Sequence, residues 1–188
     1  MMGQFGREAS MIRDCSRRDS DTILDIVNKA AEAYRVFIPA KEWKDPYMPA
    51  EELRQDLAAG VRFVGWEQEG GLVGIMGLQP VRDVVLIRHA YVRPEWQRHM
   101  IGSALLGELC RRNERPMLVG TWAASSWAIR FYEKHGFRRV PEAQREALLR
   151  GYWTVPDAQI AASVVLADRE WWRRQGGGET GWPEEGLQ

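Results

Sequence analysis

The segment 84–122 constrains the fold more than any other part of the chain. It reads as an aliphatic strand, VVLIRHAYV (84–92), a stop at Pro94, an amphipathic helix over 101–112 and a second aliphatic strand, MLVGTW (117–122). A strand–helix–strand unit of this kind forms a right-handed crossover between parallel strands. The chain is therefore expected to contain a parallel strand pair next to a helix.

The other segments predict a helical N-terminal third, an antiparallel meander and a mixed C-terminal region. Further strands are expected at 11–15, 61–67, 72–79, 137–140 and 160–168, and further helices at about 20–34, 49–60, 128–135 and 142–150. This order predicts an α/β fold with a mixed, mostly antiparallel central sheet of about six to seven strands, flanked by helices.

The length of 188 residues fits one domain. We expect a single domain over 11–175, an N-terminal extension over 1–10 and a disordered acidic tail over 176–188. The 26 basic residues balance the 26 acidic residues, so the formal net charge is zero. This argues against a protein whose main function is to bind nucleic acid or an anionic membrane. No apolar run approaches the roughly 18 residues of a membrane span, and the N-terminus does not resemble a signal peptide.

The cysteines and histidines are too dispersed for a metal site. Cys15 and Cys110 are far apart, and His89, His99 and His135 form no pair at ligand spacing. We therefore expect a cytoplasmic protein with ordinary thiols and no metal.

The junction between the strand at 84–92 and the following helix is the most informative local feature. The start of a helix presents unpaired backbone N–H groups, and the helix dipole adds positive potential there. Gly102 and Ser103 lie in that first turn, and Arg98 and His99 precede it. The pattern indicates an anion site, although most junctions of this kind bind only water.

Two motifs resemble the GCN5-related N-acetyltransferase (GNAT) superfamily. The first is AYVRPEWQRHMIGSALL (90–106), a strand end with a Val-x-Pro pattern, a loop and a helix; the second is WAIRFYEKHGF (127–137). The segment 12–31 also resembles the family's first strand and helix, so the similarity runs from about 11 to 168. The resemblance implies a GNAT-type acyl-CoA N-acyltransferase fold.

The resemblance also implies a binding site for acetyl-CoA as co-substrate. Loop amides would wrap the coenzyme A pyrophosphate, and the preceding strand end would bind the pantetheine arm. The residues carried over to these roles are Ala90, Tyr91, Val92, Gln97, Arg98, His99, Met100, Ile101, Gly102, Ser103, Ser125 and Phe131. Met100 stands where the family usually has glycine, and Ser125 where many relatives have asparagine.

Met100 bears directly on cofactor affinity. A left-handed conformation would cost this residue about 1 kcal/mol. Methionine in place of glycine is therefore expected to lower the affinity for the cofactor by up to about tenfold.

Acetyl transfer to an amine needs a base for the amine and an acid for the departing thiolate. The resemblance assigns the acid to Tyr132, because tyrosine is neutral at pH 7 and can donate a proton. The alternative is that Tyr132 is ordinary core, since it shares a helical stripe with its neighbours. The base stays open between Glu67, His89 and a water chain. Strand alternation places His89 on the face opposite Arg88.

The acceptor is less defined. The loop after the first helix carries Tyr34, Phe37, Trp43 and Tyr47, which either form an aromatic acceptor wall or pack the loop.

The leading hypothesis is an enzyme that moves acetyl from acetyl-CoA to a primary amine of a small molecule or peptide, by direct attack in a ternary complex. The alternatives are a non-catalytic acyl-CoA-binding or regulatory module and a protein or nucleic-acid interaction domain. If exposed, Trp171 and Trp172 would mark a homodimer contact.

Overall fold

The structure, a computed structural model, describes residues 10–38, 40 and 43–176. The strands are β1 (Met11–Asp14), β2 (Arg62–Gln68), β3 (Gly71–Val81), β4 (Val84–Val92), β5 (Met117–Trp122), β6 (Arg138–Arg139) and β7 (Ser163–Ala167). The α-helices are α1 (Ser20–Ala31), α2 (Ala50–Ala58), α3 (Ile101–Arg112), α4 (Ser126–Lys134), α5 (Glu142–Tyr152), α6 (Asp157–Ala161) and α7 (Arg169–Arg174). Short 3-10 turns are η1 (Arg17–Asp19), η2 (Glu32–Tyr34) and η3 (Pro94–Trp96).

The strands form a seven-stranded mixed sheet in the order β1-β2-β3-β4-β5-β7-β6. β4 and β5 pair in parallel, from Val85 opposite Met117 to Ile87 opposite Val119. β1 with β2, β2 with β3, β5 with β7 and β6 with β7 are antiparallel. The predicted fold class is confirmed, including the parallel pair joined through α3.

The chain divides into two compact units. The first contains the chain up to Leu78 and residues 88–112; the second contains 79–87 and the chain from Asn113 onward. The predicted termini, 1–10 and 176–188, lie almost wholly outside the described residues.

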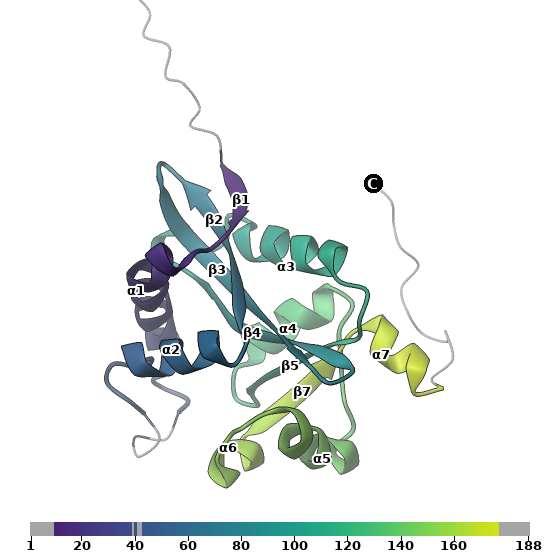
Figure 1. Ribbon diagram of the computed structural model, residues 1–188. Coiled ribbons are helices and arrows are strands. Elements are labelled where there is room, and N and C mark those ends of the chain that lie inside the picture. The colour runs from purple at the N-terminus through teal and green to yellow at the C-terminus, as the bar shows by residue number, and fades with distance from the viewer. Residues whose placement is uncertain (1–9, 39, 41–42, 177–188) are drawn as a thin grey trace, which may run out of the picture. The chain divides into compact units, whose positions relative to one another are not determined.

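In the first unit, helices cover both faces of β2 and β3. Figure 1 shows α1 and α2 on one side of these strands and α3 on the other. One face carries Phe63 and Ile75, which pack with Ile26 of α1 and Leu53 of α2 in a buried core. On the other face, a Cβ at Gly74 would lie 2.8 Å from Ile101 and 3.2 Å from Val92. Glycine therefore permits the close approach of α3 and the end of β4 to β3.

The predicted alternation fails inside β4. His89 has a φ of 51°, in the left-handed region. Both Arg88 and His89 reach the carboxylate of Asp56 on α2, although they are adjacent in the strand. Side chains of consecutive residues point to opposite faces only in a regular strand, so the expected placement of Arg88 opposite His89 is wrong.

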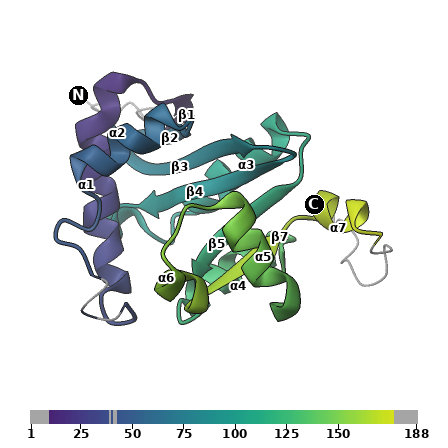
Figure 2. The same ribbon diagram turned by 60° about the horizontal axis from the view of Figure 1, so that its bottom comes forward.

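The second unit has its own core around β5 and β7. Figure 2 shows α5 and α6 beside β7, and their residues Leu149 and Ile160 pack with Val165. The last strand begins at Ser163 and not at Ile160, because Pro156 starts the short helix α6 before it. Helix α7, whose first turn is capped by Asp168, was also not predicted.

The expected homodimer contact at the last tryptophans is not supported. Trp171 is 5% exposed and belongs to the core of the second unit, and Trp172 is partly buried against the same core. Helix α7 turns these rings inward, so they provide no exposed apolar patch.

None of the described helices has the length and apolar character needed to cross a membrane.

Candidate functional site

The loop before α3 has an unusual backbone. Arg98 and Met100 have φ angles of 66° and 60°, so two non-glycine residues of this loop are left-handed. Such residues are uncommon outside glycine and asparagine. The Met100 side chain is 76% exposed and points away from the core. The loop therefore contains two left-handed residues, and Met100 carries the backbone cost expected of a non-glycine residue in this conformation.

The amides of this loop are free to bind a ligand. Within the described part of the chain, no backbone hydrogen bond is recorded from the N–H groups of residues 98–103. The first hydrogen bond of the helix is donated by Ala104 to the Met100 carbonyl, 3.0 Å away. Unpaired amides together with the positive end of the α3 dipole form an anion site, which fits the pyrophosphate expected here.

Side chains of the loop stabilise its shape from outside. The Gln97 amide donates to the Val92 carbonyl over 3.2 Å, and His99 Nδ1 donates to the Gln97 carbonyl over 2.9 Å. Arg93 donates its backbone N–H to Val73 and its guanidinium to the Leu72 carbonyl. These bonds fix the end of β4, the segment of Ala90, Tyr91 and Val92, next to β3.

Asp56 joins two neighbouring residues of β4. Its Oδ2 accepts a hydrogen bond from His89 Nε2 over 2.7 Å, and its Oδ1 lies 3.1 Å from the Arg88 guanidinium. Burial favours the protonated form of Asp56, but the hydrogen bond from His89 and the nearby positive charges outweigh it and lower its pKa. The carboxylate is therefore ionised, and His89 donates from Nε2.

This arrangement leaves His89 Nδ1 as a potential proton acceptor. In a neutral imidazole with the proton on Nε2, Nδ1 carries a lone pair. No partner of Nδ1 is recorded among the described residues. The ring is held by Asp56 and by stacking on Phe63, with 5.9 Å between the ring centres. A carboxylate, a histidine and a free ring nitrogen are the elements of a general base.

Sequence reasoning missed Asp56. It lies 33 positions before His89, and a lone aspartate in a short amphipathic helix reads as solvent-exposed. A weak signal existed, because Asp56 is one position before Leu57, which faces the core, and close to the end of α2.

Glu67 is engaged elsewhere. It forms an ion pair with Arg13 of β1, which also pairs with Asp19. Moving a proton to Glu67 would disrupt this network, so the geometry favours His89 over Glu67 as a base.

Some of the predicted acceptor aromatics lie together. Tyr34 contacts Tyr91 edge to face, with 6.3 Å between ring centres. Trp43 lies 5.2 Å from Tyr47, and the Arg35 guanidinium lies 5.3 Å from the Trp43 ring. Phe37 is 43% exposed.

The second unit holds the other three predicted site residues, in or next to α4. Tyr132 is 5% exposed and contacts Phe131 and Phe137 edge to face. Ser125 precedes α4 and is fully buried, and its hydroxyl has no hydrogen-bond partner. A buried hydroxyl without a partner is costly, so it fits a role in binding a polar ligand.

Comparisons with known proteins agree with the two motifs. A family model described as an acetyltransferase (GNAT) domain matches residues 59–139, a range that contains both. No curated protein matches the chain significantly.

Solved structures show the same fold at low identity. The PaiA N-acetyltransferase of Thermoplasma acidophilum, in complex with coenzyme A, has a TM-score of 0.64 at 17% identity, covering 85% of this chain and 98% of that chain. A GNAT-family acetyltransferase of Staphylococcus aureus Mu50 has the same TM-score, identity and coverage. The ribosomal-protein-S18-alanine N-acetyltransferase of Escherichia coli has a TM-score of 0.62 at 18% identity, covering 85% and 93%.

The domain match contains both the loop before α3 and the helix of Tyr132, and the seven-stranded mixed sheet is the one shared with these structures. The resemblance predicted from the two motifs is therefore confirmed: residues 59–139 match an acetyltransferase (GNAT) domain, and the chain has the fold of these acetyltransferase structures.

Proposed function

We propose that this protein is an N-acetyltransferase that transfers an acetyl group from acetyl-CoA to a primary amine by direct attack in a ternary complex. The observation that carries the proposal is the row of unpaired amides at residues 98–103, in a loop with two left-handed residues. This loop lies inside the matched acetyltransferase domain.

The loop amides would bind the coenzyme A pyrophosphate. Hydrogen bonds from backbone amides depend little on side-chain identity, which is consistent with a methionine at position 100. The end of β4, at Ala90 to Val92, would bind the pantetheine arm through its edge N–H and C=O groups. Ser125 and Phe131 complete the proposed contacts, and the unpartnered Ser125 hydroxyl supports its inclusion.

His89 is the proposed general base. Acetyl-CoA supplies the activated acyl group as a thioester. The amine nitrogen bonds to the acyl carbon, its proton goes to His89 Nδ1, and the C–S bond breaks. Asp56 acts as a positioning residue, because its hydrogen bond over 2.7 Å sets the tautomer of His89 and stabilises the imidazolium.

Tyr132 is the proposed general acid for the departing thiolate. The support is its place in the second motif and the ability of a neutral phenol to donate a proton. The transferred proton would then be on sulfur, and free coenzyme A would leave.

The acceptor is proposed to be a small-molecule or peptide amine. The aromatic contacts of Tyr34, Tyr91, Trp43 and Tyr47 support an acceptor with an apolar or cationic group near the amine. Because the similar Escherichia coli protein is a ribosomal-protein-S18-alanine N-acetyltransferase, peptide N-termini belong in the substrate panel.

Thermal denaturation with acetyl-CoA and a free-thiol release assay over a panel of amines test the proposal together. We expect stabilisation by acetyl-CoA and thiol release with at least one amine. Stabilisation without turnover on any amine would favour the non-catalytic acyl-CoA-binding module. No stabilisation at saturating ligand would exclude both functions.

Replacement of His89 tests the base. His89→Gln keeps a polar side chain next to Asp56 but removes the proton acceptor, so turnover should fall by about 100-fold or more with acetyl-CoA binding unchanged. Asp56→Asn should reduce turnover less than His89→Gln does, because the proton acceptor itself remains. Glu51→Gln, an exposed residue of the same helix, is the control. Unchanged turnover in His89→Gln would point to water as the base.

Replacement of Tyr132 tests the acid. Tyr132→Phe keeps the edge-to-face packing with Phe137 and removes only the hydroxyl. Turnover should fall at least tenfold while acetyl-CoA binding persists. Wild-type turnover in this variant would assign Tyr132 to the core.

A further inference from the structure

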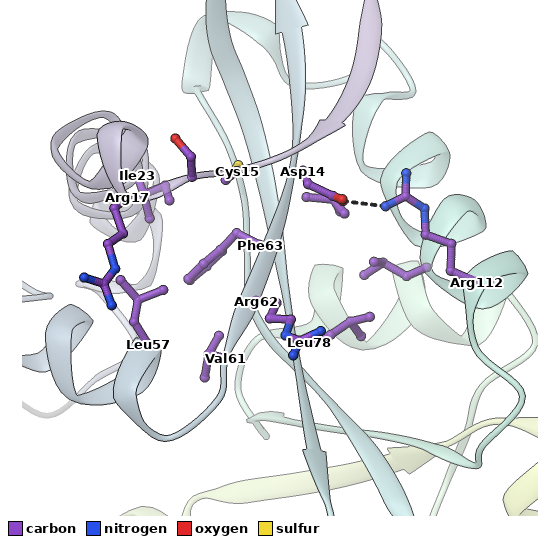
Figure 3. Close-up of a pocket in the computed structure, with 13 residues that line it drawn as sticks. Asp14, Cys15, Arg17, Ile23, Leu57, Val61, Arg62, Phe63, Leu78 and Arg112 are labelled. Carbon is purple, nitrogen blue, oxygen red and sulfur yellow. Dashed lines mark hydrogen bonds and ion pairs between the residues drawn. The ribbon is translucent and has the colours of Figure 1, made fainter.

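A pocket of about 390 Å³ lies in the first unit, where β1 ends and β2 begins (Figure 3). Its volume is near the lower limit of small-molecule sites, which span about 300–1,000 Å³. None of the residues proposed above to bind acetyl-CoA lines it, and neither do Asp56 and His89. Its lining residues are Asp14, Cys15, Ser16, Arg17, Ile23, Leu57, Val61, Arg62, Phe63, Val64, Leu78, Leu109 and Arg112.

The walls of the pocket are largely apolar. Ile23 and Leu57 come from α1 and α2, and Val61 and Phe63 from the start of β2. Figure 3 shows the Phe63 ring between β2 and the helices, with Ile23, Leu57 and Val61 around it. Leu78 and Leu109 extend the apolar lining. An apolar body is therefore the part of a ligand that these walls would accept.

The polar part of the lining is positively charged. Arg112 is neutralised by ion pairs with Asp14 and Glu108. Arg17 and Arg62 are exposed, and no ion pair is recorded for either of them among the described residues. Asp14 is the carboxylate of the lining and is already paired with Arg112. Two uncompensated guanidinium groups beside an apolar wall favour an anion and disfavour an amine.

We propose that this pocket is a second ligand site, which binds a monocarboxylate with a compact apolar body. The carboxylate would pair with Arg17, and the apolar body would lie against Phe63, Leu57 and Ile23. Because the Phe63 ring also stacks on His89, a ligand in the pocket would influence the position of His89, the proposed base. The site itself does not depend on the proposed acetyl transfer.

Cys15 gives an independent way to observe the pocket. Its thiol lines the cavity, and burial raises its pKa to about 12, so its reaction with an alkylating reagent is slow and sensitive to access. Cys110 is exposed and would react first, so the experiment uses a Cys110→Ser background.

Isothermal titration of the full-length protein with octanoate and 3-phenylpropionate tests the proposal, with octylammonium as the matched cation. We expect saturable binding of at least one carboxylate and none of octylammonium; which carboxylate binds distinguishes a straight-chain from an aromatic body. Arg17→Gln should weaken binding about fivefold, whereas Arg18→Gln, an exposed neighbour outside the lining, should not. The bound carboxylate should also slow alkylation of Cys15 at pH 9.

Three outcomes would overturn the proposal. The first is that neither carboxylate binds. The second is that the wild type and Arg17→Gln bind the carboxylate equally well. The third is that acetyl-CoA displaces the carboxylate and the carboxylate does not protect Cys15 from alkylation. Because these readouts require no turnover, they stand apart from the test of acetyl transfer.

Discussion

Two helix starts in the first unit differ in what pairs with their free backbone N–H groups. Ser16 and Asp19 form a capping box at the start of the 3-10 turn η1, which continues directly into α1: the Ser16 hydroxyl accepts from the Arg18 N–H, and Asp19 accepts from the Ser16 N–H over 2.7 Å. Before α3, no side-chain cap is recorded, and the amides of residues 98–103 have no recorded backbone partner in the described chain. Because free amides at a helix start are costly when they lack a partner, the first start contributes to stability, and the second is the one that we propose binds a ligand.

A carboxylate added at the start of α3 should separate helix stability from ligand binding most strongly. Ser103→Asp places a negative charge in the first turn of α3, where it stabilises the helix by about 0.5 kcal/mol and repels an anionic ligand. We expect acetyl-CoA binding, measured by calorimetry, to weaken more than tenfold, while the melting temperature of the free protein stays equal or rises.

Ser103→Asn is the control for that variant, because it has the size of aspartate without its charge. Equal acetyl-CoA affinity in the wild type and in Ser103→Asp would contradict the assignment of this helix start to the pyrophosphate.

Relief of the backbone cost at Met100 should have a smaller effect in the opposite direction. Glycine adopts a φ of 60° without the penalty of about 1 kcal/mol, so Met100→Gly should tighten acetyl-CoA binding by up to about fivefold. Met100→Leu retains the penalty and a similar side chain, and should bind like the wild type. Weaker binding by Met100→Gly would show that the methionine side chain itself contributes to affinity.

A substitution at the helix start before α1 should lower the free energy of unfolding and leave acetyl-CoA binding unchanged. Asp19→Asn removes the charge that pairs with Arg13 and weakens the capping box, at a cost of about 1 kcal/mol at pH 7. Urea denaturation should show this loss, with acetyl-CoA affinity unchanged.

The pH dependence of that loss has a definite sign. The hydrogen bond from Arg13 holds the pKa of Asp19 far below its usual value, so the native state favours the ionised form. This stabilisation is present above the unfolded pKa of about 3.9 and fades as the pH falls below it toward the folded pKa. The difference between wild type and Asp19→Asn should therefore shrink below about pH 4; a constant difference would assign the loss to something other than the charge.

Much of the fold was predictable because it depends on local pattern. The bounds of β4, α3 and β5 agree with the aliphatic runs and the helical period of the sequence. The errors occur where short elements depend on their neighbours: α6 and α7 were missed, and Trp171 was expected at the surface although α7 turns it into the core. The prediction of a single domain over 11–175 stays a prediction.

The sequence by itself determined the resemblance to the acetyltransferase (GNAT) domain, through two motifs whose spacing reflects a strand, a loop and a helix. It also determined which residues could carry an acid or an anion site. Only the tertiary structure decided that the amides before α3 have no recorded internal partner, that Arg88 and His89 meet at Asp56, and that two unpaired arginines border an apolar pocket. These features depend on residues up to about 100 positions apart and on a left-handed residue inside a strand, which no local pattern specifies.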